Sequence, residues 1–306
     1  MKHPRIELTH LDNLWFQVTG TLCNLACTHC FNNSGPDVKT FGFLPLDDVR
    51  RELEVGARRG VREVFFTGGE PFLHTAIAEM LETSLEYAAT TVLTNGTLIN
   101  DRMADRLAEI ERRSRYSLEI RVSLDSFDER TNDAIRGPGV FQRVMATVAR
   151  LSRRGLLPLV TVVRTWSDAD EHEVLPGFVR ILHAAGYQRP RIKILPALPL
   201  GRELVRLPGA HDEPWITEEM MRGFDPELLM CSNSRIVTDR GVWVCPLLVD
   251  KPDARLGDHL EDAATGYELA HRACYTCYQY GTFCSNVNAG IEVATTLASP
   301  SERSEA

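Results

Sequence analysis

The chain has 306 residues, of which 43% are hydrophobic and 25% charged, so it is long enough for one large domain and a smaller one with a sizeable core. The net charge of −8 comes without a basic run, which argues against a nucleic-acid substrate and is compatible with a cationic small substrate or with ordinary surface charge. The N-terminus has no apolar signal region, and no apolar run approaches the roughly 18 residues of a membrane span, so we expect a cytoplasmic protein without a membrane partner.

Eight cysteines lie in two groups, with none between Cys30 and Cys231. In a reducing compartment, this grouping predicts metal ligands rather than disulfides. The first group has the spacing C-x3-C-x2-C, directly after an apolar run over residues 14–18 that predicts a buried strand. Three thiols leave a tetrahedral zinc site incomplete but suit a 4Fe-4S cluster with one open iron. The alternatives are a zinc knuckle that includes His29, or unrelated core cysteines.

A second motif, Gly68-Gly69-Glu70-Pro71, follows a predicted strand over residues 61–66. Glycine has no side chain, so a ligand can approach its backbone closely. A Gly-Gly-Glu sequence alone is usually a turn. One strand-helix unit after the cysteine motif, it strengthens the cluster interpretation.

These two motifs resemble those of the radical S-adenosylmethionine (radical SAM) family, whose cluster loop has the spacing C-x3-C-x-Φ-C with an aromatic residue at Φ. His29 takes that position here. The resemblance implies that S-adenosylmethionine binds the open iron and is cleaved by one electron to a 5'-deoxyadenosyl radical, which abstracts hydrogen from a substrate. It also implies an electron donor such as flavodoxin or ferredoxin. The implied cluster ligands are Cys23, Cys27 and Cys30, and the implied cosubstrate contacts in the second motif are Gly68, Gly69 and Glu70.

Predicted strands and helices alternate over the first two thirds of the chain. The strands cover residues 14–18, 61–66, 90–94, 118–126, 158–164 and 191–195, and the helices cover 46–58, 76–87, 101–113, 141–153 and 171–185. This alternation argues for parallel strands with right-handed crossovers. The resemblance implies the α/β fold of the family, a partial (β/α)6 barrel.

Chemistry in parallel α/β folds sits at the carboxyl ends of the strands. The residues that fall there are Cys23, Gly68, Asn95, Ser123, Asp125 and Arg164. The resemblance implies that Asn95 faces the nucleoside of S-adenosylmethionine, and that Ser123 and Asp125 bind the ribose and the carboxylate of this cosubstrate. Turn formation and capping are the alternatives. Arg136 could clamp a carboxylate or cap a helix. Residues 195–202, a proline-rich loop, resemble the family segment that bears on the adenine or the substrate.

The alternation stops near residue 203. Residues 213–230 predict an acidic helical connector, and residues 235–238 and 242–244 predict a β-hairpin that turns at Gly241. We therefore divide the chain into a core barrel (1–205), a helical connector (206–230), an auxiliary module (231–290) and a tail (291–306).

The second cysteine group resembles the Twitch and SPASM modules, which hold auxiliary iron-sulfur clusters. Its members are Cys231, Cys245, Cys274, Cys277 and Cys284. The resemblance implies one auxiliary 4Fe-4S cluster, with a structural zinc site as the alternative. One thiol is then spare. We favour Cys245 as the spare thiol, because Cys274, Cys277 and Cys284 form a self-contained C-x2-C-x6-C unit that Cys231 can complete. In the alternative set, Cys231 and Cys245 at the hairpin ends join Cys274 and Cys277, and Cys284 is spare.

A spare thiol beside a carbon radical can return a hydrogen atom and so invert a stereocentre. In this the chain resembles the neomycin C epimerase type of aminoglycoside antibiotic biosynthesis. That resemblance implies a redox-neutral epimerase of a sugar substrate, with Cys245, or alternatively Cys284, as hydrogen donor. The alternatives are a dehydrogenase similar to 2-deoxy-scyllo-inosamine dehydrogenase, a peptide maturase, and a zinc-stabilised binding protein without enzymatic activity.

Overall fold

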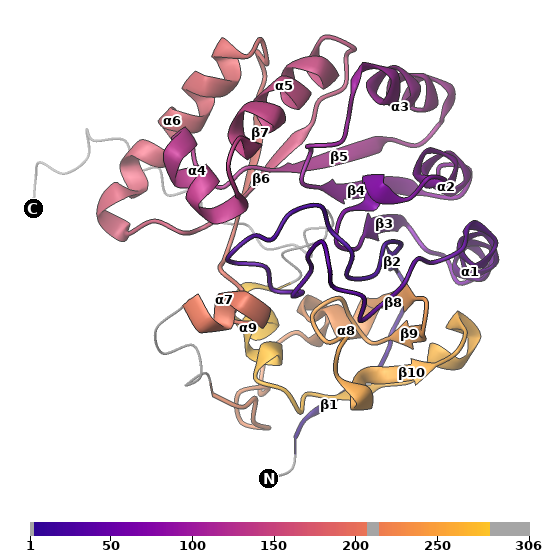
Figure 1. Cartoon of the computed structure of the whole chain (residues 1–306). Coiled ribbons are helices and arrows are strands. Elements are labelled where there is room, and N and C mark those ends of the chain that lie inside the picture. Colours follow the sequence, from indigo (N-terminus) through magenta and orange to yellow (C-terminus); the bar gives the residue numbers. More distant parts are fainter. Residues whose placement is uncertain (1–2, 207–213, 282–306) are drawn as a thin grey trace, which may run out of the picture.

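The computed structural model describes residues 3–206 and 214–281 (Figure 1). Its main element is a nine-stranded sheet in the order β10-β9-β8-β2-β3-β4-β5-β6-β7. The strands from β8 to β7 pair in parallel, and β9 and β10 continue the sheet in antiparallel pairs. The parallel strands are β2 Asn13–Gln17, β3 Glu63–Thr67, β4 Ala89–Thr94, β5 Leu118–Ser123, β6 Leu159–Val163, β7 Arg191–Leu195 and β8 Ser234–Thr238. The predicted α/β fold with parallel strands is confirmed.

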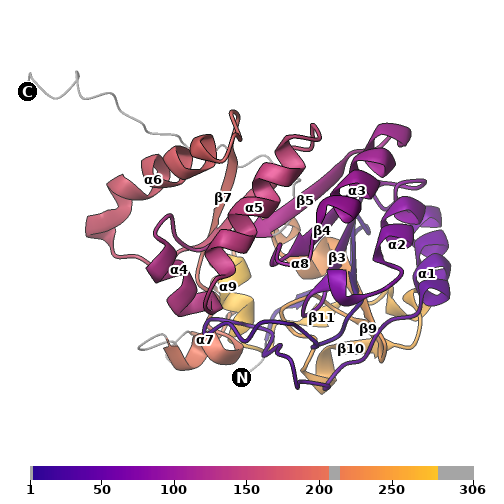
Figure 2. The same cartoon turned by 45° about the horizontal axis from the view of Figure 1, so that its top comes forward.

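Helices follow the strands and cover one face of the sheet (Figures 1 and 2). They are α1 Leu46–Arg58, α2 Ile77–Ser84, α3 Asp101–Arg113, α5 Val140–Ser152 and α6 Glu171–Ala184. A short helix not predicted from the sequence, α4 Glu129–Arg136, lies between β5 and α5. No helix in the described ranges combines the length and the hydropathy that a membrane crossing requires.

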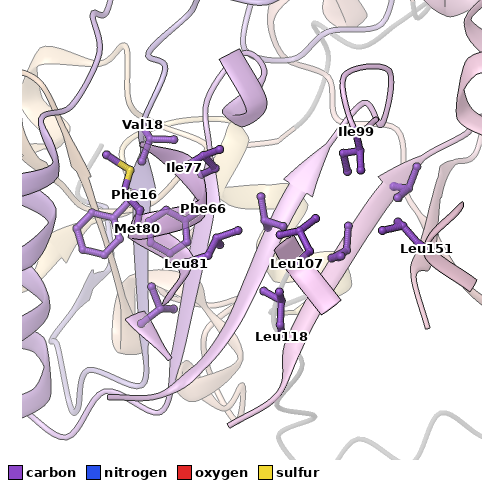
Figure 3. Packing of buried hydrophobic residues seen from close by; sticks show 14 of the residues in the cluster. Phe16, Val18, Phe66, Ile77, Met80, Leu81, Ile99, Leu107, Leu118 and Leu151 are labelled. Atoms are coloured by element: carbon purple, nitrogen blue, oxygen red, sulfur yellow. The ribbon is translucent and has the colours of Figure 1, made fainter. Parts of the chain in front are cut away.

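Both faces of the sheet are buried, which explains the unbroken apolar runs in the sequence. Successive side chains of a strand point to opposite faces. Phe16 and Phe66 therefore join the core under the helices, together with Met80 of α2 (Figure 3). Their neighbours Trp15 and Phe65 face the other way and stack with ring centroids 4.1 Å apart, in a second core that includes C-terminal residues.

The C-terminal region joins the barrel through the sheet itself. The predicted hairpin is confirmed as β8 and β9 Gly241–Trp243, followed by β10 Arg255–Gly257. However, β8 pairs in parallel with β2, from Asn13 with Ser234 to Phe16 with Val237. Two short strands, β1 Arg5–Ile6 and β11 Tyr267–Glu268, also pair the start of the chain with this region. The hairpin is therefore an extension of the barrel sheet.

The predicted helical connector is wrong for the part of it that the structure describes. Residues 214–229 contain turns and the 3-10 helix η4 Pro226–Leu228, and the one-turn helix α8 Met230–Asn233 begins only at its end. Proline lacks the backbone N–H that a helix interior needs, and Gly223 takes a positive φ of 76°. The remaining helices are α7 Gly201–Arg206, at the end of the predicted loop 195–202, and α9 Ala273–Tyr280. The predicted tail and Cys284 lie outside the described residues.

Candidate active site

The cluster loop, residues 18–35, leaves the carboxyl end of β2 and carries the first three cysteines. The three thiols lie close enough together that the charge of one affects the pKa of another. Burial raises the pKa of Cys23 to about 12, and the charges of Glu70, Cys27 and Cys30 raise it further, while the Leu25 N–H opposes them. A thiolate in such a place needs a cationic partner, and an iron cluster supplies one. The donor set therefore fits the expected 4Fe-4S group.

Three N–H donors point at sulfur atoms in this loop. The backbone N–H of Leu25 donates to Cys23 Sγ at 3.4 Å, and that of Ser34 donates to Cys30 Sγ at 3.3 Å. The side-chain amide of Asn95, directly after β4, donates to Cys23 Sγ at 3.7 Å. Such donors favour the thiolate and fix the orientation of a ligand. Asn95 thus lies at the cluster loop, and the contact with the nucleoside that the resemblance implies for it stays a prediction.

Gly68 and Gly69 are required by the cluster loop. A Cβ on Gly69 would lie 2.0 Å from the carbonyl oxygen of Leu22 and 2.8 Å from the backbone nitrogen of Cys23. A Cβ on Gly68 would lie 2.3 Å from Thr19 Oγ1. All three distances are shorter than a Cβ contact allows. The second motif therefore packs directly against the first, and the expected contact of these glycines with a cosubstrate amine stays a prediction.

Glu70 is fully buried, and its carboxylate is occupied within the protein. Its Oε1 accepts from Thr94 Oγ1 at 2.7 Å and from the Phe72 N–H at 3.0 Å, and its Oε2 accepts from the Asn95 N–H at 2.7 Å. Burial raises the pKa of Glu70 to about 7, although these donors lower it. The side chain ties the end of β3 to the end of β4. The cosubstrate contact implied for Glu70 stays a prediction.

Asp125, two residues after β5, is the buried centre of an ion-pair network. Its Oδ2 lies 2.6 Å from Nε of Arg136 and 2.7 Å from Nε2 of His29, and its Oδ1 accepts from the Val163 N–H at 3.1 Å. Burial raises the pKa of Asp125, but Arg136 and His29 outweigh it and hold the pKa well below its usual range. Arg136 therefore binds a carboxylate, as one of the two alternatives predicted, and this carboxylate is the side chain of Asp125.

This network also engages the residue at position Φ. Nε2 of His29 is directed to Asp125, so in a zinc knuckle that used His29 as its fourth ligand only Nδ1 could coordinate. The ion pair therefore links the cluster loop to the end of β5.

Two other predicted residues lie at the same edge of the sheet. Ser123 ends β5 and is partly exposed. Arg164 follows β6 and forms ion pairs with Asp168 and Glu171, which raise its pKa. The binding role implied for Ser123 stays a prediction.

Arg202, the last residue of the loop 195–202, binds the cluster loop. The sequence predicts the loop 195–202 but not these contacts. The Nε of Arg202 donates to the Cys27 carbonyl at 2.8 Å, its Nη2 to the Ser34 carbonyl at 2.6 Å, and its backbone N–H to the Cys30 carbonyl at 3.0 Å. A Cβ on Gly201 would lie 2.3 Å from the Phe31 carbonyl oxygen. The Gly-Arg pair after a proline-rich loop was the available signal, but no spacing rule relates it to the cysteines.

A second thiol group lies in the C-terminal region. One cavity is lined by four cysteines and by apolar side chains on the surrounding segments. The cysteines are Cys231 in α8, Cys245 after β9, and Cys274 and Cys277 in α9. An i, i+3 spacing places two side chains on one face of a helix, which is how α9 presents its pair.

Burial dominates the electrostatics of this second group. It raises the pKa of Cys231 to about 12 and of Cys245 to about 11, and the pKa of Cys274 is raised as well. The charge of Cys245 adds to the effect on both Cys231 and Cys274. Four mutually close thiols in an apolar cavity fit the ligand set of an iron-sulfur cluster. Within the described ranges, no three His, Cys, Asp or Glu side chains surround a position for a single metal ion.

Comparison with known sequences links the chain to one family and to enzymes that it matches in part. The Radical SAM superfamily matches residues 18–174, just over half of the chain. The antilisterial bacteriocin subtilosin biosynthesis protein AlbA of Bacillus subtilis is 29% identical over 162 residues, covering 52% of this chain and 32% of AlbA. The mycofactocin maturase MftC of Mycolicibacterium smegmatis is 32% identical over 152 residues, covering 49% and 37%. The matched part thus spans about a third of the length of these relatives.

A solved structure extends the likeness beyond the matched sequence. Streptococcus suis SuiB, bound to S-adenosylmethionine, superposes with a TM-score of 0.61 at 17% identity, over 80% of this chain and 63% of SuiB. At this level of identity the likeness shows the fold.

Proposed function

Because the chain belongs to the radical SAM superfamily, and so uses a 4Fe-4S cluster and S-adenosylmethionine, we propose that it oxidises a peptide substrate with the help of an auxiliary 4Fe-4S cluster. The observation that carries this proposal is the cavity lined by four thiols. The auxiliary ligands are Cys231, Cys245, Cys274 and Cys277. This set replaces the sequence-based preference for Cys284 as a ligand, since Cys245 lines the same cavity as the other three.

When bound, the two clusters and the cosubstrate supply a radical that takes a hydrogen atom from a substrate carbon and an acceptor for the electron left there, while a proton passes to solvent. The residues of the chain position these groups. Asn95 directs its amide to Cys23 and is itself held by Glu70. Arg202 and the pair of Asp125 with His29 fix the cluster loop on two sides.

The peptide substrate is supported by the relatives. MftC is named a maturase, AlbA a bacteriocin biosynthesis protein, and SuiB has been solved with its precursor peptide SuiA. The cavity lined by four thiols also supports the proposal, because four thiols are enough to hold one auxiliary cluster, and such a cluster could accept the second electron of a two-electron oxidation.

A second candidate is epimerisation of an aminoglycoside-type sugar, in which a thiol returns the hydrogen atom. It is supported by the cysteine count: with four thiols around one cavity, the fifth cysteine of the region, Cys284, is left over. In this candidate Cys284, rather than Cys245, is the hydrogen donor.

Anaerobic purification and turnover test both candidates. Protein with about eight irons per chain supports two clusters, and colourless protein that contains zinc contradicts them. Incubation with S-adenosylmethionine, a reductant and panels of peptides or aminoglycosides in deuterated water then separates the reactions. A product that has lost two hydrogens supports oxidation, whereas an isomer carrying one deuterium supports epimerisation.

Two matched variants test the ligand set. Cys245→Ala should lose the auxiliary iron, while Cys284→Ala should keep it. The reverse result would restore the assignment made from spacing, with Cys245 as the free thiol.

A further inference from the structure

Arg235, in β8, is a buried cation next to the auxiliary thiols. Its exposed fraction is 0%, the lowest of the three buried arginines among the described residues. The other two have carboxylate partners: Arg136 lies 2.6 Å from Asp125, and Arg121 lies 2.8 Å from Glu119. Arg235 forms no ion pair with any carboxylate in residues 3–206 or 214–281.

Backbone carbonyls accept the hydrogen bonds of this guanidinium. Its Nε donates to Ala263 at 2.9 Å, its Nη1 to Cys231 at 2.9 Å and to Ser234 at 2.6 Å, and its Nη2 to Thr265 at 2.5 Å. These bonds satisfy the donors but bring no negative charge. One of them ends on the backbone carbonyl of Cys231, so the guanidinium is tied to the segment that carries an auxiliary cysteine, although it does not itself line the cavity.

Negative charge near Arg235 would come from the cysteines once they ionise as cluster ligands, because burial raises the pKa to about 12 for Cys231 and to about 11 for Cys245. Cys231 and Cys245 favour its charged form, whereas burial and Arg59 oppose it. A buried charge without a partner costs several kcal/mol. A cluster held by four thiolates is a negatively charged body, and it would occupy the adjacent cavity. The cation and the cluster would then compensate each other.

We propose that Arg235 is the counter-charge of the auxiliary cluster and raises its reduction potential. The inference rests on the proposed second cluster. Reduction adds one negative charge to the cluster, and a fixed cation beside it stabilises the reduced state more than the oxidised state. Arg235 would therefore help the cluster to accept the electron that the substrate leaves behind, without touching the substrate.

Potentiometric titration of the auxiliary cluster alone tests this role. A full-length background with Cys23, Cys27 and Cys30 changed to Ala removes the first cluster, so the remaining iron and its spectrum report on the second. Into this background we would introduce Arg235→Gln, which removes the charge but keeps an N–H donor, Arg235→Met, which removes both, and Arg235→Lys, which keeps the charge.

We expect both neutral variants to lower the ratio of reduced to oxidised cluster at least tenfold at a fixed potential, a shift of about 59 mV for a one-electron couple. Arg235→Lys should stay within threefold of the background. If a neutral variant keeps both its iron and the original potential, the proposal is wrong.

Iron content decides the cases in which a potential cannot be measured. Loss of iron from the neutral variants but not from Arg235→Lys would support a requirement for the charge. Loss from all three variants would assign Arg235 to hydrogen bonding alone and contradict the proposal. A background protein without iron would overturn the auxiliary cluster itself.

Discussion

The two thiol groups of this chain are built in opposite ways. The cluster loop is irregular backbone in which Cys23 is buried and Cys27 and Cys30 are partly accessible, and it is held by polar contacts from Asn95 after β4, Asp125 after β5 and Arg202 in α7. The second group has four buried thiols carried by short helices and a strand end, among apolar side chains. A site that must admit a cosubstrate needs an open ligand position and an external polar frame. A site that only exchanges electrons can be closed and apolar.

The largest expected effect is loss of chemistry at the open site. Changing any one of Cys23, Cys27 or Cys30 to Ala should abolish reductive cleavage of S-adenosylmethionine, because no other thiol of the loop can replace the missing ligand. The fold should change little, since Cys27 and Cys30 are partly exposed and Cys23→Ala removes only one sulfur atom from the main core. Formation of 5'-deoxyadenosine measures the activity, and circular dichroism checks the fold. Cleavage that survives any of these changes would contradict the assignment of the loop.

At the closed site the expected effect is structural. Cys274→Ala or Cys277→Ala should remove about half of the iron and destabilise the segment around α9, because metal binding and local folding are coupled there. Iron analysis and limited proteolysis measure the two effects. Unchanged iron content would argue for a single cluster and revive the zinc interpretation.

The polar frame of the open site can be broken at Asp125. Asp125→Asn should lower the free energy of unfolding by about 3–5 kcal/mol, because it leaves Arg136 buried without its partner. Asp101→Asn is the matched control: Asp101 also contacts two arginines, Arg150 and Arg154, but at the surface, where solvent screens such pairs and they contribute little to stability. If denaturant titration gives the same loss of unfolding free energy for both variants, the buried Asp125 network stabilises the fold no more than a surface ion pair, and the prediction is wrong.

A smaller effect should appear as a pH dependence of the protein without iron. The pKa of Glu70 is about 7 in the folded chain, against an ordinary value of 4.5, so the folded state holds a proton that the unfolded state has lost between these values. The free energy of unfolding should therefore fall as pH rises from about 4.5 to 7, by on the order of 3 kcal/mol. Glu70→Gln cannot titrate and should lack this slope. A wild-type profile that is flat in this window would contradict the pKa.

Local patterns predicted much of this molecule. The alternating elements, the two glycines beside the cluster loop and the hairpin at Gly241 follow from short-range spacing and turn chemistry. Local patterns did not predict which groups the side chains of the site contact. Asp125 was expected to bind a ligand, yet its carboxylate is taken by His29 and Arg136, because a strand-end position does not reveal which way a side chain is held. Contacts between distant segments carry no local signal.

Arg202 illustrates the same limit. It is separated from Cys27 by 175 positions, and only the path of the chain around the barrel brings them together. The prediction of a helical connector before Met230 was wrong for another reason. Its acidic composition resembled a helix, but proline and glycine interrupt it.

The parallel pairing of β8 with β2 has a consequence for synthesis on the ribosome. Strand β2 emerges among the first residues, yet one of its two neighbours in the sheet is made only after residue 233. Until then a buried central strand has an open edge, which is prone to misassociation. A fragment that ends at residue 205 would keep that edge permanently exposed next to the cluster loop. The sheet beside the first site is therefore expected to be complete only after β8 has been made.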